Sequence, residues 1–289
     1  MSFISKLRSG KFVITAEISP PKGTDTSRML RDAVLLKDIV DAVNVTDNQR
    51  AVMRMSPLAA CCILREKGLE TIMHITCRDR NRLSLQSELI GAHSLGIRNV
   101  LVMSGDHPSK GDHEGAKPVY DLDSVQLLGM IRKLNKGVDL AGDELEGRTD
   151  MCVGAVTNIG LNEVALIKLR KKIKMGAIFF QTQAVFDVEV FSGFMDKINE
   201  IDQEKIRVIA GIIPLRSERS AHFINKVPGI RVPDDIIGQI KEAKEPQVEG
   251  MKIAADIIKE LRTMCGGVHI MPLGNHENTR TLLEMAGLL

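Results

Sequence analysis

Residues 71–105 read TIMHITCRDRNRLSLQSELIGAHSLGIRNVLVMSG, and this stretch decides the fold. Two short segments with β-branched residues, 71–77 and 99–105, flank a segment of helical period at 83–95. Gly96 follows the helical segment, where a helix commonly ends on a left-handed residue. A strand, a helix and a second strand in this order predict a βαβ unit with parallel strands.

The same unit recurs along the whole chain. Further strands are expected at 12–18, 41–47, 151–158, 177–183, 206–214 and 267–273. Helices are expected at 27–40, 56–67, 123–134, 162–175, 187–199, 217–226, 248–265 and 277–286, with an extra helix at 233–244. Eight such units, without a linker and without a glycine-rich turn after the first strand, favour a closed barrel over an open doubly wound sheet. We predict an α/β fold: a single (β/α)8 TIM barrel with extra C-terminal helices, forming one domain over residues 1–289.

Composition excludes several classes of protein. Hydrophobic residues make up 44% of the chain and charged residues 26%, which excludes an intrinsically disordered chain. A net charge of +2 and 3% aromatic residues give no footprint for nucleic acid, and no run of 18 apolar residues occurs. The five cysteines form no CxxC pair and no secretory segment is seen, which indicates a reducing compartment. We expect a cytoplasmic protein with no nucleic-acid or membrane partner.

Polar side chains gather toward the carboxyl ends of the expected strands. Because side chains alternate between the two faces of a strand, members of each set share a face. The sets are Thr15 with Glu17, Asn44 with Thr46, His74 with Thr76, Ser104 with Asp106, and Gln181 with Gln183, joined by Thr157 and Asn158 at a strand end. All strands of a parallel barrel end at one rim, where catalytic residues collect. This convergence predicts an enzyme with its site at that mouth.

Glu17 is the most informative single residue. It lies in a strand of valine, isoleucine and alanine, where an unpaired carboxylate is costly. It therefore pairs with a buried Lys or Arg, faces outward at a strand end, or acts as a general acid whose pKa is raised by burial.

Asp106 follows the strand expected at 99–105, and alternation places it with Ser104 on the face of Val100 and Val102. One reading is a turn or helix-cap residue. The other is an acceptor for the N–H groups of a heterocycle.

Four more residues have both a structural and a functional reading. His74 is a satisfied core histidine or a ligand contact, Thr46 reflects β propensity or a contact, and Gln183 bonds a neighbouring strand or a ligand. Lys172 ends a basic run at 168–172 that is a solvated helix face or a phosphate contact.

The loop at 106–120 contains His107, Asp112, His113 and Glu114, but their spacing matches no standard zinc motif. We expect no metal site. The chain also lacks a P-loop, a GxSxG motif and an HExxH motif.

Six motifs in order, over essentially the whole chain, resemble those of the methylenetetrahydrofolate reductase family. They are Glu17-Ile18-Ser19-Pro20-Pro21-Lys22, Asn44-Val45-Thr46-Asp47, His74-Ile75-Thr76-Cys77, Ser104-Gly105-Asp106-His107-Pro108, Thr182-Gln183 with Phe186-Asp187, and Gly211-Ile212-Ile213-Pro214. The resemblance implies a (β/α)8 flavoprotein of one-carbon metabolism and methionine biosynthesis that reduces 5,10-methylenetetrahydrofolate to 5-methyltetrahydrofolate. It implies FAD as the flavin, with FMN as the alternative, NAD(P)H as the usual electron donor, and a homo-oligomer.

Positions that match the family carry implied roles. Glu17 is implied to be the general acid that protonates folate N10, so that the hydride from flavin N5 meets an iminium. Asp106 is implied to be the second catalytic residue, near both flavin and pterin, and Gln183 to bind the pterin together with Glu17 and Asp106. The implied flavin contacts are Thr46, His74, Ser104, Gly105, Asp106 and Lys172.

The chain departs from the family pattern in several places. Ile18-Ser19 replaces an aromatic pair, Ser104 replaces an arginine, and 156–159 replaces a Tyr-Pro-Glu stretch. These three departures leave the isoalloxazine site intact and weaken the contacts to the nucleotide tail, which leaves FMN open as the alternative to FAD. Ala165 stands at an acidic position on the adenosine side. The loop at 215–219 lacks the aromatic residue that stacks on nicotinamide or folate, which favours a partner subunit that delivers electrons.

Two other functions stay open. One is a flavin-free, pterin-binding methyltransferase barrel, and the other is a non-catalytic barrel subunit of a larger complex. Colourless active protein favours the first. Co-purification with a partner, together with no turnover of this chain alone with any donor, keeps the second open.

Overall fold

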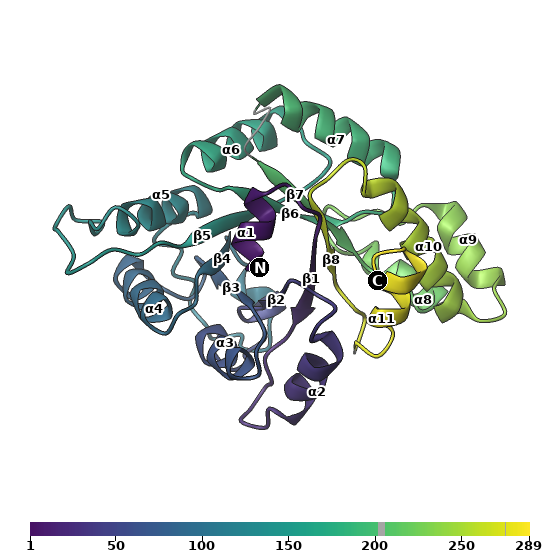
Figure 1. Ribbon diagram of the computed structural model, residues 1–289, viewed down its shortest axis with the longest axis horizontal. Coiled ribbons are helices and arrows are strands. Elements are labelled where there is room, and N and C mark those ends of the chain that lie inside the picture. The colour runs from purple at the N-terminus through teal and green to yellow at the C-terminus, as the bar shows by residue number, and fades with distance from the viewer. Residues whose placement is uncertain (202–205, 275) are drawn as a thin grey trace.

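Eight parallel strands pair in chain order in the computed structural model, which describes residues 1–201, 206–274 and 276–289 (Figure 1). β8 closes on β1, with Thr15 opposite His269 in the register. The strands are β1 (Val13–Ile18), β2 (Ala42–Val45), β3 (Thr71–Thr76), β4 (Asn99–Met103), β5 (Cys152–Thr157), β6 (Phe179–Ala184), β7 (Arg207–Ile212) and β8 (Gly267–Ile270). The predicted (β/α)8 barrel is confirmed.

Helices surround the strands on all sides of the barrel (Figure 1). They are α1 (Phe3–Arg8), α2 (Ser27–Leu36), α3 (Pro57–Glu66), α4 (Arg82–Ser94), α5 (Ser124–Leu134), α6 (Glu163–Lys174), α7 (Val188–Ile201), α8 (Glu218–Ile224), α9 (Asp234–Glu242), α10 (Pro246–Leu261) and α11 (Thr279–Met285), with short 3-10 turns η1 (Gln49–Ala51) and η2 (Pro108–Lys110). Every helix predicted from the sequence is present, and α1 is an addition. Within the described ranges, no helix has the length and apolarity that a membrane crossing requires.

Local sequence explains where several helices begin and end. Gly68, Gly96 and Gly176 follow α3, α4 and α6 with φ angles of +86°, +83° and +109°. These left-handed conformations suit glycine and end each helix just before the next strand. At the other end, the side chains of Asn81 and Asn162 accept hydrogen bonds from the first turns of α4 and α6.

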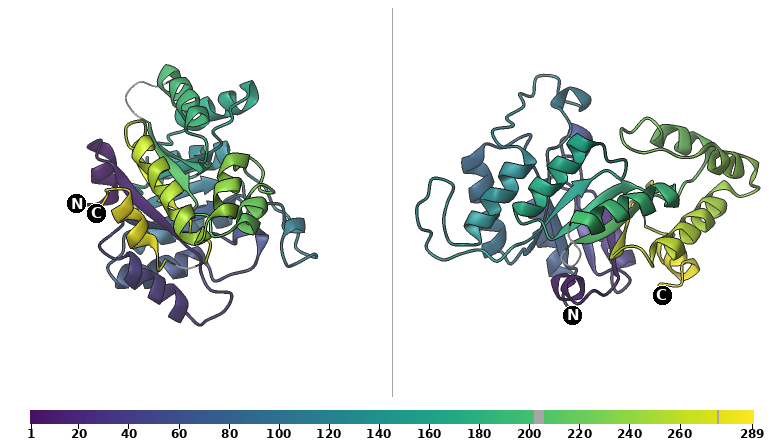
Figure 2. Two further views of the ribbon diagram at one scale, coloured as in Figure 1. Left: turned by 90° about the vertical axis from the view of Figure 1, so that its right-hand side faces the viewer. Right: turned by 90° about the horizontal axis from the view of Figure 1, so that it is seen from above.

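The barrel lumen has a lower end, which is the end where the strands start. This lower end is apolar and is closed by α1. Phe3 and Leu7 of α1 pack against the inward-facing residues nearest the strand starts, namely Val13, Ala42, Ile72, Leu101, Cys152, Phe179 and Ile209. The rings of Phe3 and Phe179 meet edge to face at 5.6 Å. Figure 2 shows α1 at one end of the barrel, while the loop after β4 rises at the other.

β4 corrects one expectation from the alternation of side chains. Val100 and Val102 face the outer core between strands and helices, whereas Leu101 and Met103 contact the lumen cluster. β4 ends at Met103, so the next residues leave the strand, and Gly105 turns the chain with φ +84°. The prediction that Ser104 and Asp106 continue the face of Val100 was wrong, because alternation stops where the strand stops.

Candidate active site

A cavity of about 1260 Å³ opens where the carboxyl ends of the strands meet. Pockets for a single small ligand usually have a volume of about 300–1000 Å³. The predicted site residues all line this cavity: Glu17, Thr46, His74, Ser104, Gly105, Asp106, Lys172 and Gln183. The barrel therefore brings together side chains from different strands and from α6.

A layer of neutral polar side chains forms the floor of the cavity. The Asn44 amide nitrogen lies 2.9 Å from His74 Nε2 and donates to Gln181 Oε1 at 2.7 Å. Thr15 Oγ1 lies 2.9 Å from His269 Nδ1 and accepts a 3.4 Å hydrogen bond from the Gln181 amide. Burial lowers the pKa of His74 to about 4 and that of His269 to about 3, so both rings are neutral near pH 7. His74 is thus a bonded core histidine that also lines the cavity.

Glu17 faces the cavity from β1 as a half-buried side chain. Burial raises the pKa of its carboxyl, while a hydrogen bond from Gln49 and the charge of Arg54 act in the opposite direction. Gln49 Nε2 donates to Glu17 Oε1 at 3.0 Å. Of the two structural readings, the outward-facing one is wrong, because the carboxyl lines the lumen mouth.

His276 fixes the backbone of Glu17 from behind. Its Nε2 donates to the Glu17 carbonyl at 2.7 Å, and its Nδ1 lies 3.0 Å from Thr279 Oγ1. Burial lowers the pKa of His276, which keeps the ring neutral and able to accept at Nδ1. β1 and the segment before α11 are therefore tied together next to the acid.

Asp106 lies at the rim, with its side chain 46% exposed and 3.8 Å from Lys110 Nζ. The loop that carries it is fastened from below. The buried guanidinium of Arg78 donates to the Asp106 carbonyl at 3.3 Å and also pairs with Asp79. Asp106 therefore projects from an anchored loop and stays accessible from the cavity.

Lys172 belongs to the basic run at 168–172, but its side chain points inward to the cavity wall. Its side chain is buried, and Nζ donates to the Val156 carbonyl at 2.7 Å. Burial and the neighbouring Lys168 lower its pKa to about 8. The reading of the whole run as a solvated face was wrong for Lys172, because its amine lies at the cavity wall.

The structure adds residues that the sequence did not single out. Asp47 is buried, binds Arg80 at 2.8 Å and accepts from the backbone and hydroxyl of Thr76. Phe223 on α8 lines the cavity, with the Arg50 guanidinium 5.4 Å from its ring centre. An aromatic ring thus reaches the cavity from α8, although 215–219 contains none. No local sequence signal predicts these contacts, since the partners are far apart in the chain.

The cavity wall has features that fit a flavin. Thr46 Oγ1 is buried at the wall and has no hydrogen-bond partner among the described residues. A buried hydroxyl without a partner is unfavourable unless a ligand supplies one. Lys172 offers a cation for a phosphate, and the neutral ring of His74 offers an uncharged contact for a planar polar ring.

Nothing in the described ranges gathers three or more His, Cys, Asp or Glu side chains around a common metal position. In the loop after β4, Asp112 pairs with Lys22 and with His113 instead. His107 accepts from the Ser109 backbone and caps η2.

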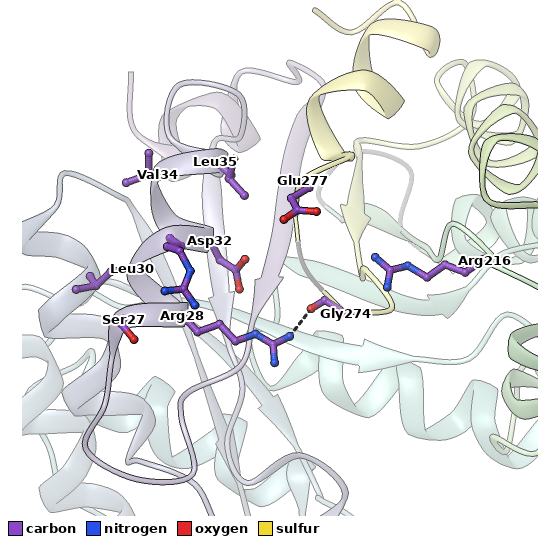
Figure 3. A pocket seen from close by; sticks show the side chains of 10 residues that line it. Ser27, Arg28, Leu30, Asp32, Val34, Leu35, Arg216, Gly274 and Glu277 are labelled. Carbon is purple, nitrogen blue, oxygen red and sulfur yellow. Dashed lines mark hydrogen bonds between the residues drawn. The ribbon is translucent and has the colours of Figure 1, made fainter.

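A second hollow of about 840 Å³ lies beside the mouth, between α2 and the segment after β8 (Figure 3). Arg28, Asp32 and Gly274 line both spaces, so the two adjoin each other. Arg28 donates to the Gly274 carbonyl at 2.9 Å across this boundary. Figure 3 shows Arg28 and Arg216 on opposite sides of Gly274, with Asp32 and Glu277 both lining the hollow.

Comparisons with known proteins agree on one family. The family model for methylenetetrahydrofolate reductase matches residues 3–287. Methylenetetrahydrofolate reductase 2 of Schizosaccharomyces pombe is 24% identical over all of this chain, which spans 47% of that relative. The 5,10-methylenetetrahydrofolate reductase of Pectobacterium carotovorum is 26% identical over 87% of this chain and 82% of its own length. That of Salmonella typhimurium is 24% identical over 96% and 92%.

Solved structures agree on the architecture. A Clostridium thermocellum protein described as binding two copies of 5-methyl-5,6,7,8-tetrahydrofolic acid superposes with a TM-score of 0.68 at 15% identity, covering 98% of this chain and 97% of its own. A long-chain alkane monooxygenase gives 0.57 at 13% identity, covering 96% and 90%. At these identities the likeness concerns the fold alone. The match of the family model across nearly the whole length shows that the chain belongs to the methylenetetrahydrofolate reductase family.

Proposed function

We propose that this chain reduces 5,10-methylenetetrahydrofolate to 5-methyltetrahydrofolate with a bound flavin. The observation that carries the proposal is Glu17, a half-buried acid that faces the mouth cavity of a barrel of this family. The cavity volume of about 1260 Å³ supports room for two ring systems rather than one. The likeness to a protein described as binding 5-methyltetrahydrofolate supports a folate as ligand.

Glu17 supplies the proton in this proposal. Its raised pKa keeps the carboxyl protonated closer to neutral pH than an ordinary glutamate, as a general acid requires. Proton transfer to folate N10 breaks the N10–methylene bond and leaves an iminium at N5, while Glu17 becomes the carboxylate. A bound reduced flavin supplies the hydride. Gln183 and Asp106 bind the pterin and orient it.

The flavin contacts in this proposal are Thr46, His74, Ser104, Gly105, Asp106 and Lys172. Thr46 brings the unpartnered hydroxyl, and Lys172 brings a buried amine for the phosphate. FAD is the proposed flavin and FMN the alternative, since Ala165 lines the cavity without a carboxylate for the adenosine side. NAD(P)H or an electron-delivering partner subunit reduces it, in a cytoplasmic homo-oligomer.

Anaerobic optical spectroscopy on the purified protein tests the proposal. The protein should be yellow, bleach with a reductant and regain its colour when 5,10-methylenetetrahydrofolate is added. Reduced protein that this folate never reoxidises would contradict the proposal. Colourless protein that transfers a methyl group would indicate the methyltransferase instead.

The Glu17→Gln variant tests the assigned acid. We expect reoxidation by the folate to slow by about 10²–10⁴-fold, because the amide donates no proton, while flavin binding and reduction stay unchanged. Glu66→Gln, the same change at an exposed position ending α3, is the matched control. Equal loss of both half-reactions in Glu17→Gln would contradict the role.

A further inference from the structure

The hydrogen bond between Gln49 and Glu17 has no part in the reaction described so far. Gln49 Nε2 lies 3.0 Å from Glu17 Oε1, although Glu17 is on β1 and Gln49 begins the turn η1. The other end of the Gln49 amide is also occupied, since Ser19 Oγ donates to Gln49 Oε1 at 3.4 Å. Ser19 thereby sets the orientation of the amide, so that its N–H end faces Glu17.

The loop that presents Gln49 has an uncommon backbone. Asn48, Arg50 and Ala51 have φ angles of +43°, +58° and +57°. Residues other than glycine rarely adopt this left-handed region, and such backbone persists only where the surroundings enforce it. Gln49 is thus held in a conformation that an unconstrained loop would leave.

Contacts on both sides enforce that conformation. The Asn48 side chain accepts from the Arg54 backbone at 2.9 Å and donates to Asp79 at 3.3 Å. Further along, the Met53 backbone donates to Asp112 at 3.1 Å. The backbone on both sides of Gln49 is therefore held by contacts of its neighbours.

The direction of this bond decides which oxygen of Glu17 carries a proton. In a protonated carboxyl, one oxygen is a carbonyl acceptor and the other is a hydroxyl donor. The N–H of Gln49 occupies Oε1 and favours it as the carbonyl, which leaves the proton on Oε2. Once the proton has gone, the same N–H stabilises the carboxylate that remains.

We propose that Gln49 is a positioning residue that keeps the proton of Glu17 on Oε2 and holds that oxygen in place for transfer to the folate. The inference rests on the proposed function, because it takes Glu17 as the acid. Gln49 acts through Glu17 and is not itself placed against the reacting atoms.

Loss of this bond should also weaken the acid in a known direction. Burial raises the pKa of Glu17, and Gln49 and Arg54 oppose that rise. Behind Glu17 lies the neutral ring of His276, which Asp32 on α2 faces in turn. Without the amide, burial is less opposed and the pKa of Glu17 rises further. Glu17 acts as an acid only while it is protonated. The pH above which the rate of reoxidation by the folate falls therefore moves upward.

The Gln49→Met variant tests the proposal, because methionine keeps the length of the side chain and removes the N–H. We expect reoxidation by 5,10-methylenetetrahydrofolate to slow by about tenfold, with its alkaline limb displaced upward. Flavin binding and flavin reduction should not change. Gln49→Asn, which keeps an amide, should recover part of the rate, and Ser19→Ala should show a smaller displacement in the same direction.

A second readout does not depend on turnover. Carbon-13 NMR of protein labelled at glutamate carboxyls, with Glu17→Gln used for assignment, measures the pKa of Glu17 directly. An upward displacement of this pKa is expected in Gln49→Met, because the hydrogen bond from Gln49 lowers it. An unchanged pKa and pH limb with a uniform loss of rate would overturn the proposal and leave Gln49 as loop structure only. Gln49→Ala serves the same test if methionine distorts the loop.

The two proposals fail in different ways. If Glu17→Gln keeps full turnover with the folate, the assigned acid is wrong whatever Gln49 does. If Glu17→Gln loses turnover while Gln49→Met keeps the wild-type rate and pKa, the acid stands and the positioning role is wrong.

Discussion

Along β1, three inward-facing side chains mark three levels of the barrel lumen. Val13 packs in the apolar lower cluster, Thr15 belongs to the neutral hydrogen-bonded layer, and Glu17 faces the mouth. β6 repeats the order with Phe179, Gln181 and Gln183. The lower level is a cluster of apolar side chains, whereas the mouth holds a half-buried acid and the buried Thr46 hydroxyl, which has no hydrogen-bond partner among the described residues. Stability and ligand chemistry therefore reside at opposite ends of the same strands.

The largest expected effect on stability is at the lower end. Phe179 is fully buried, meets Phe3 edge to face and fills the lumen beside Gly154. Phe179→Ala should lower the free energy of unfolding by about 4 kcal/mol, since it removes a buried ring and leaves a cavity. Denaturant unfolding measures this, and Gln183→Ala at the mouth of the same strand is the comparison. A smaller loss for Phe179→Ala than for Gln183→Ala would break the division between the two ends.

Acid should destabilise the middle layer. The pKa of His74 in the folded state is about 4, below the ordinary value of 6.5. As the pH falls from 6.5 to 4, His74 binds a proton in the unfolded chain but not in the folded chain. The free energy of unfolding therefore falls over this range. The loss reaches about 3 kcal/mol at pH 4 for His74, with a further contribution from His269.

Unfolding measured at several pH values checks this loss. His74→Gln should reduce the slope without abolishing it, because His269 and His276 still contribute. An unaltered slope in His74→Gln would show that the layer does not exclude the proton.

Gly154 allows a sharper test of packing at the lower end. A Cβ at this position would lie 2.2 Å from the ring of Phe179, so Gly154→Ala should cost about 2 kcal/mol through overpacking. The cost should vanish in the Phe179→Ala background, where the ring is gone. A double-mutant cycle on the free energy of unfolding measures this coupling. Additive losses would mean that the ring and the glycine do not share one space.

The smallest effect is expected at the rim. Arg50 lies over the ring of Phe223 with both side chains exposed, where a cation–π contact contributes about 0.5–1 kcal/mol. Arg50→Gln should therefore change the free energy of unfolding by less than 1 kcal/mol. A loss as large as that of Phe179→Ala would place part of the stabilising core at the mouth.

The sequence predicted the barrel because its signals are local and repeated. Gly68, Gly96 and Gly176 mark helix ends, and alternation assigns the inward faces of β1, β2, β3 and β6. Local signals failed at β4, where alternation was extended beyond Met103 into a loop. They also failed to predict α1, whose six residues are held by packing against the lumen rather than by their own periodicity.

The contacts within the site depend on long-range geometry. Gln49 reaches Glu17, and His276 reaches the Glu17 backbone from the far end of the chain. Nothing in the residues next to Gln49 or His276 indicates these partners, because they meet only after the barrel closes. Polar residue types at strand ends predicted where a site lies, but not which hydrogen bonds it contains.

Phe3 and Leu7 close the lower end of the lumen, and this limits how ligands enter and leave the barrel. With that end sealed, molecules enter and depart on the side of the strand carboxyl ends. A molecule seated against the polar layer cannot leave while another covers it nearer the rim. Two ligands bound in this way should then depart in the reverse order of their arrival.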